Sequence, residues 1–142
     1  MSFATHHRMV RIACTAIALS LGLGFLLASP ASAAINPNCA VNATKPWDND
    51  VYVYSTTTVT CYTTNSSVLA TRAGNMIQEQ AVVWVNRGSW NYNSSAGSAT
   101  LVAQNQYYCN GHGTDNWRGE GLGDSSDGGE TIIWTGAVSL TC

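Results

Sequence analysis

Apolar and polar residues alternate through the C-terminal stretch of the chain, from Thr131 to Cys142. Every even-numbered residue from 132 to 142 is apolar or glycine, and most odd-numbered residues are small and polar. A period of two places successive side chains on opposite faces, which is typical of a half-buried β-strand. We therefore expect one long strand here, with Trp134 in the core and Cys142 fixing the end of the chain to it.

Short runs of β-branched and aromatic residues, separated by turn-forming residues, recur upstream of this stretch. They predict strands at 51–54, 56–64, 81–85, 99–103, 106–109 and 117–122, with the strand at 81–85 buried on both faces. Residues 34–50 are rich in turn formers and are expected to be irregular, and residues 90–97 are expected to form an exposed loop.

Segment 68–80 fits two descriptions. Leu69, Ala73, Met76 and Ile77 follow helical spacing, but Gly74 inside a helix would cost about 1 kcal/mol relative to Ala. One short helix and a further strand both remain open. The chain as a whole is predicted to be all-β, a small disulfide-stabilised β-sandwich or small barrel with at most one short helix, whose single domain covers residues 51–142.

The N-terminal third of the chain has the pattern of a targeting segment. Arg8 and Arg11 precede an apolar run from Ile12 to Ala28, and Ala31-Ser-Ala33 is a small-residue cleavage pattern. We expect residues 1–33 to be a cleaved signal peptide, with a retained membrane anchor as the alternative. A soluble, secreted, extracellular product is then expected, with no membrane span after signal cleavage.

Four cysteines follow the predicted leader: Cys39, Cys61, Cys109 and Cys142. An even number in an exported chain of this size indicates two disulfides. Sequential pairing, Cys39 with Cys61 and Cys109 with Cys142, needs the least loop closure and is favoured. Nested pairing, Cys61 with Cys109 and Cys39 with Cys142, is the alternative.

Cys61, Trp84 and the Tyr107-x-Cys109 pair follow one another in the order found in immunoglobulin domains. The chain resembles that family in these four residues alone, and the interval from Cys61 to Trp84 is longer than the usual one. The resemblance implies an immunoglobulin-like sandwich with a Cys61–Cys109 bridge across its core.

Charge excludes some classes of partner. Of the six Lys and Arg residues, Arg8 and Arg11 lie in the predicted leader, so four remain against eight Asp and Glu, a net charge of −4. Nucleic acids and anionic membranes are poor partners for such a chain. The negative charge gathers near Asp124, Asp127 and Glu130, whose carboxylates lie among glycines and could hold calcium, although a solvated turn is the simpler interpretation.

Aromatic residues beside amides give the strongest indication of a binding site. Trp90, Asn91 and Tyr92 lie in the polar segment, and Trp117 follows another polar run. Flat rings beside amides suit the apolar faces and hydroxyl edges of sugars, and they equally suit protein interfaces. These four residues are the predicted ligand-binding set.

The sequence therefore predicts a secreted, non-enzymatic module that binds a glycan or a cell-surface ligand. The second hypothesis is a secreted inhibitor that presents a disulfide-stapled loop, residues 110–115, to a protein target. The third is a small secreted hydrolase that uses His112, the only histidine after the leader, or a pair of carboxylates. No cofactor other than calcium is expected.

Overall fold

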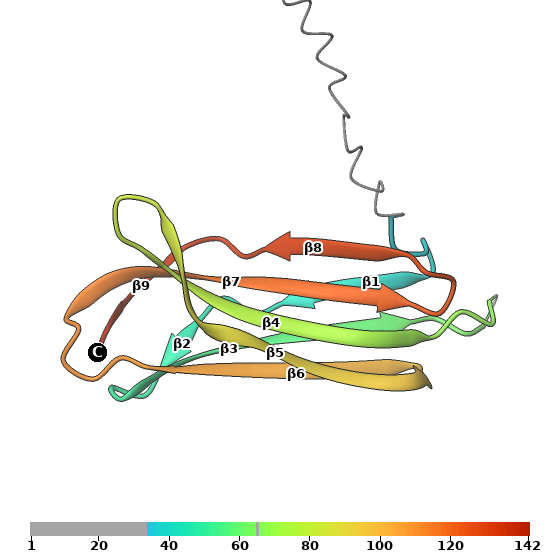
Figure 1. The fold of residues 1–142 in the computed structure, drawn as a ribbon, viewed down its shortest axis with the longest axis horizontal. Helices are drawn as coiled ribbons and strands as arrows, with labels where there is room; N and C mark the ends of the chain where they lie inside the picture. The colour runs from blue at the N-terminus through green and yellow to red at the C-terminus, as the bar shows by residue number, and fades with distance from the viewer. Residues whose placement is uncertain (1–33, 65) are drawn as a thin grey trace, which may run out of the picture.

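The computed structural model describes residues 34–142 except residue 65, and these residues form two antiparallel β-sheets packed face to face (Figure 1). The predicted all-β sandwich is confirmed, and segment 68–80 is a strand. None of the described residues belongs to a helix that is long and apolar enough to cross a bilayer. The predicted signal peptide, residues 1–33, lies outside the described residues.

We name each sheet after its central strand. The β3 sheet pairs β3 with three strands, and its members are β1 (Cys39–Ala43), β2 (Trp47–Asp48), β3 (Tyr52–Cys61) and β6 (Thr100–Tyr108). The β7 sheet has the order β5-β4-β7-β8, with β9 also paired to β7. Its members are β4 (Ala70–Gln80), β5 (Trp84–Ser98), β7 (Thr114–Ser125), β8 (Glu130–Trp134) and β9 (Val138–Thr141).

Glycines allow the two sheets to approach closely. Gly119, Gly121 and Gly123 alternate along β7 and face the buried side of β3. A Cβ atom added to Gly121 would lie 2.7 Å from Thr57 Oγ1, and one added to Gly123 would lie 2.8 Å from a methyl group of Val59. The sandwich is therefore thin along this line, because one of its two facing strands contributes no side chains there.

A polar layer crosses the core beside these glycines. The buried Asn75 side chain of β4 donates from Nδ2 to Thr57 Oγ1 at 2.8 Å and to Ser55 Oγ at 3.2 Å. Two apolar clusters lie on either side of it. One is built from Cys39, Val59, Cys61, Ala70, Ala73, Leu101 and Ala103, and the other from Val53, Ile77, Cys109 and Trp117. These hydrogen bonds offset part of the cost of burying the polar side chains, while Asn75 Oδ1 has no hydrogen-bond partner among the described residues.

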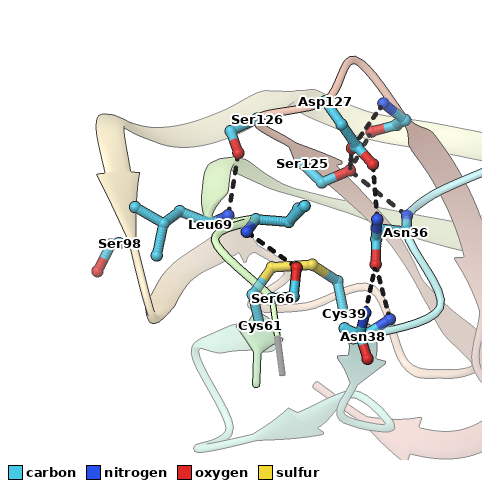
Figure 2. The surroundings of a disulfide bond; sticks show 12 residues. Asn36, Asn38, Cys39, Cys61, Ser66, Leu69, Ser98, Ser125, Ser126 and Asp127 are labelled. Carbon is cyan, nitrogen blue, oxygen red and sulfur yellow. Dashed lines mark hydrogen bonds between the residues drawn. A yellow bond between two sulfur atoms is a disulfide. The ribbon is translucent and has the colours of Figure 1, made fainter. Parts of the chain in front are cut away.

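One disulfide closes each end of the sandwich. Cys39 and Cys61 are directly opposed on β1 and β3, and Cys109 is bonded to Cys142 at the other end. Around the first disulfide, Asn36 Nδ2 donates to Asp127 Oδ2 and Leu69 N donates to Ser126 Oγ, which ties the turn between β7 and β8 to this end (Figure 2).

Sequential pairing is thus confirmed and the immunoglobulin-like bridge is wrong. Cys61 ends β3, whereas Cys109 follows β6 at the opposite end of the same sheet, where Tyr52 opposes Tyr108. The two cysteines cannot span the core. Trp84 is half-buried at the start of β5 and does not occupy the central position that the resemblance implies.

Several predicted boundaries are also wrong. Segment 34–50 contains β1 and β2, segment 90–97 lies inside β5, and residues 81–83 form a turn in which Val82 is 98% exposed. The C-terminal run divides into β8 and β9 around Gly136.

The predicted core position of Trp134 is wrong too, because 56% of its surface is exposed. Trp134 pairs with Glu120 on β7, so it shares the outer face of the sheet with that residue. The inner positions of β7 in this region are the glycines.

The thin core leads to a prediction about Gly121. We expect Gly121→Ala to destabilise the fold by about 1–3 kcal/mol, because the new methyl group must force β3 and β7 apart. Gly136→Ala is the matched control, since a Cβ there meets nothing closer than Lys45 Cε at 3.4 Å. Urea unfolding of the oxidised variants would check this, and equal stability of the two variants would contradict the proposed close approach.

Candidate functional site

The outer face of the β7 sheet brings together aromatic and polar side chains from four strands. The strand register aligns Glu120 with Met76 and Trp134, and Arg118 with Gln78 and Asn86. Residues that share a row in this way lie on one face of the sheet. We call this surface the outer aromatic face, and its rings are Trp84, Trp90, Tyr92 and Trp134.

Trp90 and Tyr92 form a stacked pair on β5. Their ring centroids are 5.8 Å apart with an angle of 12° between the planes. Both rings lie over Gly74 of β4, where an added Cβ would come within 2.8 Å of Tyr92 Cε1 and 3.2 Å of the Trp90 ring. Gly74, which argued against a helix in the sequence, therefore provides the flat floor on which these rings lie.

A network of side-chain hydrogen bonds occupies the face beside the rings. Arg118 Nε donates to Gln78 Oε1 at 2.6 Å, and Gln78 Nε2 donates to Glu120 Oε2 at 2.9 Å and to Asn86 Oδ1 at 2.6 Å. The guanidinium of Arg118 also lies 4.4 Å from the centre of the Trp84 ring. The network thereby holds polar groups and a ring in fixed relative positions.

Trp134 joins this network through Glu120. Burial raises the pKa of the Glu120 carboxyl above its ordinary value of 4.5, while the charge of Arg118 and a hydrogen bond with the Trp134 side chain act in the opposite direction. Trp134 therefore contacts Glu120 and still exposes 56% of its surface. It combines a fixed ring with a large accessible area.

The carboxylates predicted to hold calcium have partners within the protein. Arg72 lies 2.7 Å from Asp124 and 2.9 Å from Glu130, and the hydrogen bond with Asp124 is the main cause that raises the pKa of Arg72. Asp127 accepts hydrogen bonds from Ser125 and Asn36, which lower its pKa. A calcium ion would have to displace these contacts, and the calcium site remains a prediction.

The predicted ligand-binding residues have different locations. Trp90 and Tyr92 lie on the outer aromatic face. Asn91 lies between them in the sequence and points the other way, where its Nδ2 donates to Gln104 O at 2.6 Å beside a polar pocket of about 270 Å³. Trp117 is fully buried in the core, so its prediction as a surface contact is wrong. The next inward-facing residue of β7 toward the middle of the sheet is Gly119, which leaves room for the indole.

Sequence reasoning missed Trp84, Trp134, Gln78, Arg118 and Glu120 as members of this surface. The alternation Arg118-Gly-Glu120-Gly-Leu122-Gly123 contained the signal, since glycine at every second position marks one face as closely packed and the other as available.

A second group of exposed rings lies on the opposite sheet. Trp47 stacks on Tyr54 with centroids 4.4 Å apart, and Tyr52 meets Tyr108 edge-on at 5.5 Å. This group serves as an internal comparison. The tryptophan of this group, Trp47, is 47% exposed, and one face of its ring lies against Tyr54.

No protein-family model, curated protein or solved structure matches this chain.

The raised pKa of Glu120 gives a pH-dependent prediction. Ionisation of a carboxyl whose pKa is raised on folding decreases stability as pH rises through that raised value. We therefore expect the stability of the wild type relative to Glu120→Gln to fall as pH rises above the ordinary carboxyl value of 4.5. Urea unfolding of both proteins below and above that pH would measure it.

Asp127→Asn provides a control of opposite sign. The pKa of Asp127 lies below its ordinary 3.8, so the advantage of the wild type over this variant should be lost as pH falls below that value. A wild-type advantage over Glu120→Gln that grows with rising pH would contradict the assigned burial effect.

Proposed function

We propose that this chain is an exported, non-enzymatic binding module that recognises a neutral glycan through its outer aromatic face. The observation that carries the proposal is the combination of four rings, at Trp84, Trp90, Tyr92 and Trp134, with one connected hydrogen-bond network on a single sheet face. Export is supported by the two disulfides, which fit an oxidising compartment, and by the leader pattern in the sequence.

Sugar rings have apolar C–H faces and edges of hydroxyl groups. Tyr92 and Trp134, which are 48% and 56% exposed, offer apolar area to the C–H faces of a sugar. Glu120 and Asn86 offer acceptors and an amide donor to its hydroxyl groups, and the buried Gln78 holds these two side chains in place. Because the strands and the network already hold these groups, binding would lose little side-chain entropy.

The charges favour a neutral glycan over an anionic one. Arg72 and Arg87 form ion pairs with acidic side chains, and Arg118 is bonded to Gln78 beside Glu120. A sulfate or uronate group would have to compete with these acids on a protein of net negative charge. Neutral polysaccharides avoid that repulsion.

Intrinsic tryptophan fluorescence tests the proposal. A panel of soluble neutral oligosaccharides should give a saturable change with the wild type, and we expect Trp134→Ala or Tyr92→Ala to weaken binding at least about tenfold. Trp47→Ala is the matched control, because it removes an indole of similar exposure from the other sheet and should leave the affinity unchanged.

Three other outcomes have distinct meanings. Loss of binding in Trp47→Ala alone would transfer the glycan site to the β3 sheet. Tighter binding of anionic than of neutral oligosaccharides would contradict the charge argument. No response from any glycan, with a folded protein, would overturn the proposal and favour the protein-inhibitor hypothesis, in which the loop at 110–115, exposed through residue 114, contacts a target.

A further inference from the structure

We propose a second site, for a divalent transition-metal ion, at the end of the sandwich closed by Cys109–Cys142. Glu79, His112 and Asp115 each bring one ligand atom there, and these carboxylate oxygens and imidazole nitrogen all lie within 4.8 Å of one another. The site is separate from the outer aromatic face and does not depend on the proposed glycan function.

The fold brings the three residues together from distant parts of the sequence. Glu79 lies near the end of β4 and opposes Trp117, so it shares the inner face of the sheet with Trp117 and with Asp115, two residues before it on β7. His112 comes from the connection between β6 and β7. The two carboxylates are thus positioned by neighbouring strands, and the imidazole closes over them.

The connection that carries His112 is firmly held. The backbone N–H groups of Gly111 and Gly113 both donate to Cys142 O, His112 N donates to Cys109 O, and the Cys109–Cys142 disulfide joins the same two segments. The imidazole also packs edge-on against Tyr107, with ring centroids 5.8 Å apart. A histidine positioned in this way loses little freedom when it binds a metal ion.

The donor set indicates the class of ion. One imidazole and two carboxylates suit Zn²⁺ and its neighbours in the first transition row, whereas Ca²⁺ needs six or more oxygen ligands. Ligand atoms around a tetrahedral zinc ion are about 3.3 Å apart, given bonds near 2.0–2.1 Å. Small side-chain rotations from the present separation would reach that distance.

Two further observations favour an ion at this place. Glu79 is buried, with 7% of its side chain exposed, and its ion pair with Arg87 uses Oε2, so Oε1 is the oxygen that a metal ion would take. Within the described part of the chain, the His112 imidazole and the Asp115 carboxylate make no hydrogen bond or ion pair with each other or with Glu79. A divalent cation would supply a positive charge beside Asp115 and would bind the imidazole nitrogen of His112.

Isothermal titration calorimetry tests the site directly. With untagged protein recovered from culture medium and stripped of metal, we expect Zn²⁺ to bind at one ion per chain near neutral pH, and His112→Ala to weaken binding at least tenfold. Asp115→Asn should also weaken it. The melting temperature of the wild type should rise with Zn²⁺, and this rise should disappear in His112→Ala.

Matched controls separate this site from other carboxylates and from the glycan site. Asp127→Asn and Trp134→Ala should bind Zn²⁺ as the wild type does, and Ca²⁺ should not compete at equal concentration. Zinc binding that persists unchanged in His112→Ala, or the absence of saturable binding in the wild type, would overturn the proposal.

Discussion

The close approach of β7 to β3 is the constraint on which the rest of the molecule depends. Because Gly119, Gly121 and Gly123 occupy the inner face of β7, this strand contributes no side chains to the middle of the core. Its side chains lie on the outer face instead, where Arg118 and Glu120 meet Gln78 and Trp134. The thin core and the chemically rich surface are thus two results of one alternating pattern.

The small and polar side chains in the middle of the core also lower its contribution to the free energy of folding. The middle of the sandwich is filled by hydroxyl groups and by Asn75 rather than by large apolar side chains, so it gains less from the hydrophobic effect than an aliphatic layer would. Disulfides at both ends compensate for this. A loop of the size closed by Cys109 and Cys142 stabilises a fold by about 3–4 kcal/mol in the chain-entropy model.

Sequence reasoning recovered the features that follow from composition and from loop closure. The all-β class came from β-branched and aromatic runs, and the disulfide pairing came from the shorter of the possible loops. Reasoning failed where a position depends on its partner strand. Trp134 has the alternation of a buried residue, yet the register of β8 sets it opposite the outward-facing Glu120 and sets Ile133 opposite the inward-facing Gly121, so the indole lies outside.

The candidate site was recovered only in part for the same reason. Trp90 and Tyr92 were identified because they stand out in a polar segment, but that segment was expected to be a loop. In β5 the even-numbered residues form the outer face, while Asn91 and Asn93 point toward β6. A strand with polar residues on both faces has no hydrophobic period that a sequence pattern could reveal.

The direction of those asparagines has a consequence for how copies of this protein behave toward one another. β6 is an edge strand, and the side chains of Asn91, Asn93 and Ser98 donate to three of its alternate carbonyl groups, those of Gln104, Val102 and Thr100. An edge with engaged carbonyls offers a poor template for a strand from a second molecule. The side chains of β5 therefore protect the β6 edge of the β3 sheet against pairing with a strand of a second copy.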